Sequence, residues 1–349
     1  MAKYDVYIGS FKKGEGAAVL KCIFDDDSGI IGEADRIDTV RPSYLSISDD
    51  KKTLFAILEA NEIDGVYGGG VSSINVSKEK MELISSQSTH SKGPSHLCIH
   101  DGKLIASIYG EGALVQFDID PDNTIKPISN LIKLHGCGPD KERQTQPHPH
   151  HVCLTPDGTH IAMCDLGLDR IFMYPYDKHN GISLGAKEIP CPSGSGPRHL
   201  IFSNDGRFMY VLTEMGSTVL VFSYNKNADV KLIQEISCLP VDWKGENTAA
   251  AIRISKDGNE LIASNRGHAS LALFFINEDG TLSSKGYIPT QLWPRDFDYA
   301  PSGNWLLCAN QNSNTIVVYK KDSSNFYIPH SVMETDIMPC CIVWGNKIG

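Results

Sequence analysis

Histidines are concentrated in one short segment, and their spacing allows two kinds of chemistry. The segment QPHPHHV (146–152) contains His148, His150 and His151. Alternation along an extended strand points His148 and His150 to the same side, where a His-x-His pair could ligate a divalent metal. Histidine is also the side chain whose ordinary pKa suits acid/base catalysis near neutral pH. No third ligand stands at a diagnostic spacing, so the sequence favours acid/base catalysis without a metal or cofactor.

Arginine and glutamate follow in two later segments of similar pattern. The segment GPRHL supplies Arg198 and His199, and Glu214 comes after the next strand. The segment SNRGH supplies Arg266 and His268. A guanidinium group binds a carboxylate or a phosphate through two parallel hydrogen bonds. Two arginines beside an acid/base pair can therefore hold a small anionic substrate and stabilise an oxyanion that forms on it.

These segments belong to an internal repeat that decides where their side chains meet. Each repeat has a short apolar strand, a polar turn that usually contains Asp-Gly, and a second apolar strand. Asp-Gly between two such strands predicts a hairpin, because glycine readily adopts the positive φ of a tight turn. The repeats begin at Pro42, Pro94, Pro149, Pro197, Ala249 and Pro294.

The rest of each repeat also predicts β-structure. A third run rich in β-branched and aromatic residues follows each hairpin, such as STVLVFSYN (217–225), and a more polar fourth run generally comes next. Four antiparallel strands in each unit, with no amphipathic helical stretch, predict an all-β, seven-bladed β-propeller. Residues 339–349 supply one more first strand, and residues 1–41 supply the three strands that its blade lacks. We expect the N-terminal and C-terminal strands to close the last blade of a single domain, residues 1–349, which protects strand edges.

The propeller architecture gathers the polar residues at one end of a channel. The first strand of each blade lines the central channel, and the hairpin turns mark one face of the ring. Residues just before each first strand and just after each second strand therefore meet at the opposite face. Polar and ionisable residues recur at both positions in neighbouring blades, which predicts a site at that mouth. The predicted site contains Tyr109, His148, His150, Arg198, His199, Glu214, Arg266, His268, Arg295 and Gln311.

Composition excludes several other functions. The 349 residues include 32 Lys and Arg against 42 Asp and Glu, and a net charge of -10 repels nucleic acid and anionic membranes. The N-terminal segment MAKYDVYIGS lacks the apolar run of a signal peptide, and no apolar stretch is long enough to span a bilayer. The ten cysteines show no CxxC spacing, which is typical of buried thiols in a cytoplasmic protein. We expect a monomer or small homo-oligomer that binds a small anion.

The longest repeats resemble those of one known family. The segments QPHPHHVCLTPDGTHIAMCDLGLDRI, GPRHLIFSNDGRFMYVLTEMGSTV, AAIRISKDGNELIASNRG and PRDFDYAPSGNWLLCANQNSNTI are similar to repeats of the seven-bladed lactonase propellers. That family includes bacterial 6-phosphogluconolactonase and fungal carboxy-cis,cis-muconate lactonizing enzyme. The resemblance covers nearly the whole chain and is strongest over residues 146–316. It implies hydrolysis of a small anionic sugar lactone, with 6-phosphogluconolactone of the pentose phosphate pathway as the first choice.

The resemblance also implies roles for individual residues. The family's proposed site has one His, two Arg and one Glu. The His corresponds to His148 or His150, the arginines to Arg198 and Arg266, and the Glu to Glu214. The arginines would bind the anion and stabilise the oxyanion, while Glu214 and one histidine would exchange protons with water and the leaving alkoxide. Further substrate contacts are expected from His199, Arg295, Gln311, Tyr109 and His268.

Two alternative functions use the same fold, and a third is that of six-bladed propellers. The pocket could add a carboxylate to an alkene, as in a muconate cycloisomerase. The propeller could instead be a protein-interaction scaffold, which predicts an exposed aromatic or charged patch and needs no convergent His, Arg and Glu. A calcium-dependent sugar lactonase needs an acidic cage, which the predicted rim lacks. No G-x-S-x-G motif is present, so a covalent acyl-enzyme is not expected.

Overall fold

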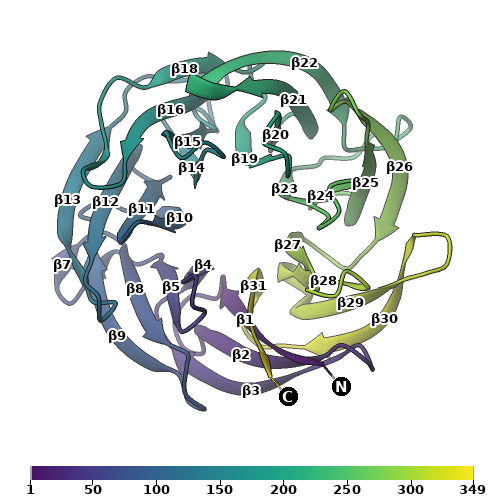
Figure 1. Ribbon diagram of the computed structural model, residues 1–349, viewed down its shortest axis with the longest axis horizontal. Coiled ribbons are helices and arrows are strands. Elements are labelled where there is room, and N and C mark those ends of the chain that lie inside the picture. Colours follow the sequence, from purple (N-terminus) through teal and green to yellow (C-terminus); the bar gives the residue numbers. More distant parts are fainter. Residues whose placement is uncertain (1, 349) are drawn as a thin grey trace.

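The computed structural model describes residues 2–348, which form a ring of seven β-sheets around a central channel (Figure 1). The sheet that joins the chain ends contains β31 (Pro339–Ile348), β1 (Lys3–Ser10), β2 (Ala18–Asp25) and β3 (Ile30–Asp38). The second contains β4 (Pro42–Ile47), β5 (Thr53–Leu58), β8 (Gly70–Asn75) and β9 (Glu82–Ser88). The third contains β10 (Pro94–His100), β11 (Lys103–Ile108), β12 (Ala113–Ile119) and β13 (Ile125–Lys133).

The remaining four sheets repeat the same order. They contain β14 (Pro149–Leu154), β15 (His160–Asp165), β16 (Arg170–Asp177) and β18 (Lys187–Pro190); then β19 (Pro197–Phe202), β20 (Phe208–Thr213), β21 (Thr218–Asn225) and β22 (Asp229–Ser237). The last two contain β23 (Ala249–Ile254), β24 (Glu260–Asn265), β25 (Ser270–Ile276) and β26 (Leu282–Pro289); then β27 (Pro294–Tyr299), β28 (Trp305–Asn310), β29 (Thr315–Lys321) and β30 (Tyr327–Glu334). Short pairings add β6 (Glu62–Ile63) to β7 (Val66–Tyr67), and β17 (Gly181–Ile182) to β16.

The predicted architecture, including closure by the chain ends, is confirmed. Strand β31 is the innermost strand of the first sheet and pairs antiparallel with β1, so that Tyr7 lies opposite Val343 and Ile8 opposite Ile342. The inner strands β31, β4, β10, β14, β19, β23 and β27 contact one another around the channel. The ring in Figure 1 therefore closes through hydrogen bonds between the first and last strands of the chain.

The hairpin turns carry the glycine conformation that the Asp-Gly motifs predicted. In the turn from β14 to β15, Gly158 has φ +70° and its N–H donates to the carbonyl of Thr155. The Thr155 hydroxyl in turn donates to Asp157, 2.7 Å away. A side chain other than glycine is strained at such a φ, so the motif fixes where each inner strand ends.

The hydrophobic core lies between neighbouring blades. Where the first and last sheets meet, Phe24 packs edge-on against Trp305 and Trp344, with ring centroids 6.1 and 5.5 Å apart. Burying each such large side chain contributes roughly 1.5–3 kcal/mol. Similar apolar clusters occupy the other junctions and hold the inner strands around the channel.

Helical structure is minimal over residues 2–348. It consists of two 3-10 turns, η1 (Lys226–Ala228) and η2 (Gln311–Ser313). Neither these nor any other helix in that range has the length and apolar character needed to cross a membrane.

Candidate active site

A β-bulge near the start of several inner strands turns one residue of each out of the regular pairing. Between β14 and β15, Pro149 pairs with Asp165 and His151 with Cys164, so His150 has no partner. A bulge re-aims the side chain of its extra residue and often lies beside a functional site. The same shift leaves one residue unpaired in four other inner strands: Ser43, Ser95, Arg198 and Arg295.

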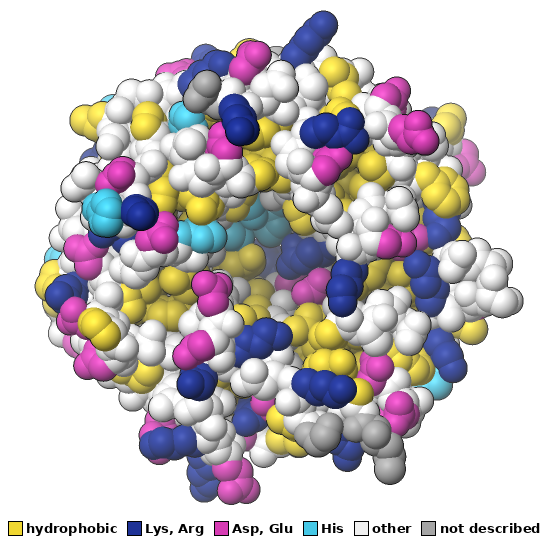
Figure 2. All heavy atoms as spheres, in the orientation of Figure 1, with side chains coloured by type: hydrophobic (Ala, Val, Ile, Leu, Met, Phe, Trp, Pro, Cys, Tyr) yellow, Lys and Arg dark blue, Asp and Glu magenta, His cyan; other side chains and the backbone are white. Residues whose placement is uncertain are grey.

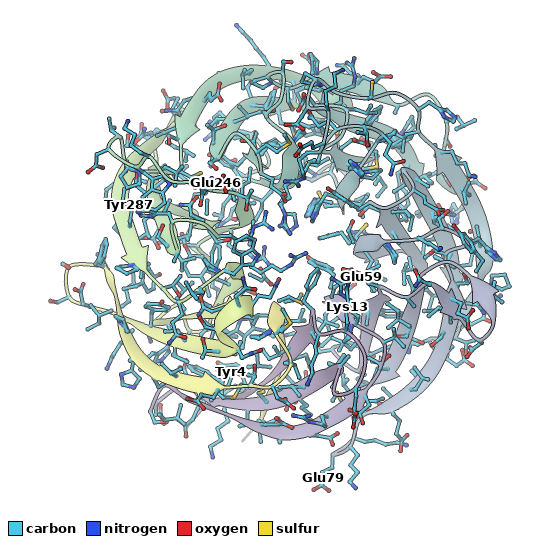
Figure 3. The ribbon with its side chains drawn as sticks, turned by 180° about the vertical axis from the view of Figure 1, so that it is seen from behind. Tyr4, Lys13, Glu59, Glu79, Glu246 and Tyr287 are labelled. Carbon is cyan, nitrogen blue, oxygen red and sulfur yellow. The ribbon has the colours of Figure 1, made fainter. Side chains whose placement is uncertain are left out.

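Several of these residues surround a cavity of about 240 Å³, which we call the arginine chamber. It is lined by Phe11, Glu59, Gly93, Pro94, Ser95, Tyr109, His150, Glu214, Arg266 and Arg295. Figure 3 shows Glu59 beside the central opening. The structure thus brings together five residues of the predicted site: Tyr109, His150, Glu214, Arg266 and Arg295.

Glu214 is held by three guanidinium groups. Its Oε2 lies 3.0 Å from Nε of Arg198 and 2.8 Å from Nη2 of Arg266. Its Oε1 accepts a hydrogen bond from Arg143. The Glu214 carboxylate is buried, with 7% of its side chain exposed, so these contacts are only weakly screened by water.

The three arginines determine the charge of Glu214. Burial alone would raise the pKa of this carboxyl, but the nearby guanidinium groups, of which Arg266 and Arg198 have the largest effect, hold it well below its ordinary value. The group therefore stays ionised at physiological pH and has no proton to donate. Its position also leaves it a weak base, because protonation would leave two buried cations, Arg198 and Arg266, without their counter-charge.

Arg198 is already committed to the protein. Its guanidinium donates to Glu214, to Nε2 of His199 at 3.0 Å and to the carbonyl of Ala250. The residue is 2% exposed and does not line the arginine chamber. The expectation that Arg198 clamps a substrate anion therefore conflicts with its surroundings, in which its donors serve to hold Glu214 and His199.

Arg266 and Arg295 both line the chamber but differ in how many of their hydrogen-bond donors the protein already uses. Arg266 donates to the backbone carbonyls of Thr248 and Ala249, besides its ion pair with Glu214. Arg295 lies over the Phe11 ring, 4.0 Å from its centroid. Its one hydrogen-bond partner within the described chain is Oε1 of Gln311, at 3.3 Å. Arg295 thus keeps most of its donors free for a ligand, and Gln311 contacts this arginine instead of lining the cavity.

The two candidate histidines occupy different positions. Strand β14 begins at Pro149 and the bulge falls on His150, so the expected strand alternation does not relate it to His148. His148 stacks on Tyr109, with ring centroids 4.2 Å apart, and its Nδ1 lies 2.7 Å from the Tyr109 carbonyl. A carbonyl only accepts, so the proton sits on Nδ1 of His148. His150 lines the chamber, and its Nδ1 is buried without a partner within residues 2–348.

Burial keeps both of these histidines neutral. Desolvation is the largest cause of the lowered pKa of His148, and nearby Arg143 adds to it. For His150, desolvation followed by the charge of Arg198 places the pKa well below its ordinary value. A neutral imidazole has an unprotonated ring nitrogen that can accept a proton from water, and the nearby positive charges weaken it as a base. The described residues contain no group of three or more His, Cys, Asp or Glu side chains placed to hold a metal.

Two residues of the predicted site lie away from the chamber. His199 is turned to the opposite side of Arg198, where it lines a different cavity. His268 hydrogen-bonds Ser270 and packs against Trp243 and Tyr287, and Tyr287 lies at the outer rim of the ring in Figure 3. His199 lies just after the bulge, where regular strand pairing turns its side chain away from the arginine chamber. His268 follows a strand, as other residues of the predicted site do, but its hydrogen bond to Ser270 holds it outside the chamber.

Sequence reasoning missed several groups around the chamber. Phe11 is enclosed by Arg295 and by Arg41, whose guanidinium lies 3.7 Å from the ring centroid, and Arg41 pairs with Glu59 at 2.8 Å. Arg143 comes from the long connection between β13 and β14. The unusual length of that connection was the available signal, since long loops in compact folds are often functional.

The charges around the chamber do not balance. Five arginines (Arg41, Arg143, Arg198, Arg266 and Arg295) face two glutamates (Glu59 and Glu214), which leaves an excess of three positive charges. This excess stands on a chain whose net charge is -10. The chamber is therefore a local attractor for a small anion.

Comparison with known proteins identifies the family. A family model described as lactonase, 7-bladed beta-propeller matches residues 5–341. The chain is 28% identical over 331 residues to the 6-phosphogluconolactonase of Bacillus subtilis, covering 92% of each protein. The crystal structure of a putative 6-phosphogluconolactonase from Bacteroides fragilis has a TM-score of 0.91 and 30% identity, covering 99% of this chain and 98% of that one. The periplasmic gluconolactonase of Pseudomonas aeruginosa has a TM-score of 0.92 and 28% identity, covering 99% of each. The chain therefore belongs to the lactonase family of seven-bladed β-propellers.

Proposed function

We propose that the arginine chamber hydrolyses a small anionic sugar lactone and that 6-phosphogluconolactone is the substrate. One observation carries the proposal: a neutral histidine, His150, and a guanidinium with free donors, Arg295, line the same small cationic cavity. The 6-phosphogluconolactonase of B. subtilis, similar along 92% of the chain, supports the choice of substrate.

The phosphate group would bind to Arg295. This guanidinium is oriented by Gln311 and by the Phe11 ring, so little side-chain freedom is lost when an anion binds. Arg143 has 40% of its side chain exposed and can turn toward the same phosphate. The fixed arginine would position the substrate, and the exposed one would close over it.

His150 would act as the general base. Its imidazole removes a proton from a water molecule as the water oxygen attacks the lactone carbonyl carbon. The carbonyl oxygen becomes an oxyanion, which Arg266 stabilises from its fixed position against Glu214 and two backbone carbonyls. The ring C–O bond then breaks, and the imidazolium returns its proton to the leaving alkoxide. The products are the open hydroxy acid and an unchanged enzyme.

Glu214 and Arg198 would act as positioning residues in this reaction. Glu214 keeps Arg266 pointed at the oxyanion, and Arg198 keeps Glu214 in place. The carboxylate also offsets part of the positive charge, which makes protonation of His150 during the reaction less costly. This assignment replaces the expected acid/base role of Glu214.

An assay with two substrates tests the proposal. Purified protein is expected to accelerate hydrolysis of freshly made 6-phosphogluconolactone well above the spontaneous rate. Carboxymuconate is the second substrate, because the cycloisomerase alternative needs the same arginines and one proton donor. Turnover of carboxymuconate alone would replace the proposed reaction, and turnover of neither would contradict the proposed substrate class.

A further inference from the structure

The opposite end of the channel contains a second and larger cavity, of about 580 Å³, which we call the collar chamber. Half-buried apolar side chains surround it, among them Ile47, Leu154, Phe202 and Trp344. Its polar residues include His151, His199, Arg253 and Asp298. Figure 2 shows the central hollow of the ring, where apolar side chains surround histidine and charged side chains.

A layer of aromatic rings separates the two chambers. Tyr44 packs on His96 with ring centroids 3.8 Å apart, His96 on His151 at 4.1 Å, and His151 on His199 at 4.9 Å. None of these four residues lines the arginine chamber, and three of them line the collar chamber. The collar chamber is therefore a site of its own and does not rest on the proposed lactonase reaction.

The polar side of the collar chamber offers hydrogen-bond donors. Arg253 donates to Asp296 at 2.7 Å and to the carbonyl of Ile252 at 3.0 Å, which leaves further guanidinium N–H groups. Arg198 donates to Nε2 of His199, so neutral His199 carries its proton on Nδ1. Arg253 and His199 can therefore each donate a hydrogen bond to a ligand.

The same surface also offers acceptors. Asp298 accepts from the backbone N–H of Tyr299, and its Oδ1 lies 3.9 Å from Nε of Arg253. Burial raises the pKa of Asp298 to about 6, so the group is an ionised acceptor at neutral pH. His151 is 9% exposed and has a buried Nδ1 without a partner in the described part of the chain.

The charge and the hydrogen-bond donors of this surface together disfavour ionic ligands. Arg253 is paired with Asp298, which lines the chamber, and with Asp296, which is buried behind it, and this excess of carboxylate disfavours an anionic ligand. An ammonium group only donates hydrogen bonds and would leave the donors of Arg253 and His199 unused. A hydroxyl group both donates and accepts, and it suits a surface that presents donors and acceptors together.

We propose that the collar chamber binds an uncharged polyhydroxy compound of the size of a sugar. Its hydroxyl groups bond to Asp298, Arg253 and His199. Its carbon skeleton packs on the apolar collar, chiefly on Phe202 and Trp344. The site differs from the arginine chamber in ligand charge, because one end of the channel selects an anion and the other a neutral compound.

Saturation-transfer NMR with D-glucose, D-sorbitol and myo-inositol tests this site. We expect transfer to at least one of the three at millimolar concentration and pH 7.5. Ser46→Trp places an indole on the wall of the chamber and is expected to abolish the transfer. Ser323→Trp, in the exposed turn after β29, is the matched control and should leave it unchanged. Asp298→Asn is expected to weaken binding about tenfold, because one charged acceptor is lost.

Three outcomes would overturn the proposal. They are no transfer to any of the three compounds, transfer that survives both Ser46→Trp and Asp298→Asn, and displacement of the compound by inorganic phosphate at constant ionic strength. A thermal melt of each variant checks that it is folded. Asp298→Asn preserves the shape of the side chain and keeps the test valid where the indole variant does not fold.

Discussion

The two chambers both draw residues from the inner strands β14 and β27 but present opposite chemistry. At the start of the strands, a bulge turns His150 and Arg295 out of the regular pairing and into the arginine chamber. Beyond the bulge, alternation resumes, and residues such as Leu154 and Phe202 form the apolar wall of the collar chamber. One extra residue in a strand thus separates a charged surface from an apolar one.

The two chambers also differ in the ratio of guanidinium groups to carboxylates. In the arginine chamber one carboxylate, Glu214, balances three guanidinium groups. In the collar chamber one guanidinium, Arg253, balances two carboxylates. The first arrangement lowers the pKa of its carboxyl, whereas burial raises that of Asp298. Substitutions at matched positions should therefore have unequal effects.

The largest effect is expected when the central carboxylates are removed. Glu214→Ala leaves two buried guanidinium groups, those of Arg198 and Arg266, without their counter-charge and should lower the free energy of unfolding by about 3–5 kcal/mol. Asp298→Ala leaves Arg253 paired with Asp296 and should cost clearly less. Urea denaturation of both variants measures the difference. An equal loss in the two variants would contradict the charge comparison.

Neighbouring histidines give the next test, because His150 and His151 face different chambers. His150→Gln should lower kcat for lactone hydrolysis by about 10²–10⁴-fold, the usual loss of a general base. His151→Gln should leave kcat within about twofold of wild type. His148→Gln decides between the two histidines left open by the sequence, and a larger loss there than in His150→Gln would move the base to His148.

Anion binding distinguishes the substrates of the arginine chamber. Arg295→Met removes a charged donor and should raise KM for 6-phosphogluconolactone about 10- to 100-fold, with a smaller change in kcat. Glucono-δ-lactone lacks the phosphate and is the matched control substrate, whose KM should hardly change. Equal increases in KM for both lactones would show that Arg295 does not bind the phosphate.

The smallest expected difference between the two chambers is in how lactone hydrolysis and polyol binding depend on pH. Desolvation and the charge of Arg198 lower the pKa of His150, so its neutral, active form persists below the ordinary histidine value near 6.5. The acidic limb of kcat/KM should therefore lie below pH 6.5. In the collar chamber, protonation of Asp298 near pH 6 should already weaken polyol binding. A lactonase limb above pH 6.5 would exclude a buried histidine as the base.

The repeat predicted the ring, because hairpin spacing and strand pattern are local properties. It also predicted that Tyr109, His150, Glu214, Arg266 and Arg295 lie close together, and they line one cavity. The pattern could not predict the bulge, because the bulge depends on pairing between strands. His148 and His199 were therefore predicted to lie in the same site as His150 and Arg198. Nor could it predict Arg143 or Phe11, which reach the chamber from loops whose paths depend on packing.

A crystal structure with 6-phosphogluconate bound tests the central claim most directly. The account predicts the phosphate on Arg295 and the carboxylate between Arg266 and His150, inside the arginine chamber. A phosphate bound beside Arg253 in the collar chamber would contradict the division of the channel into an anion site and a neutral site.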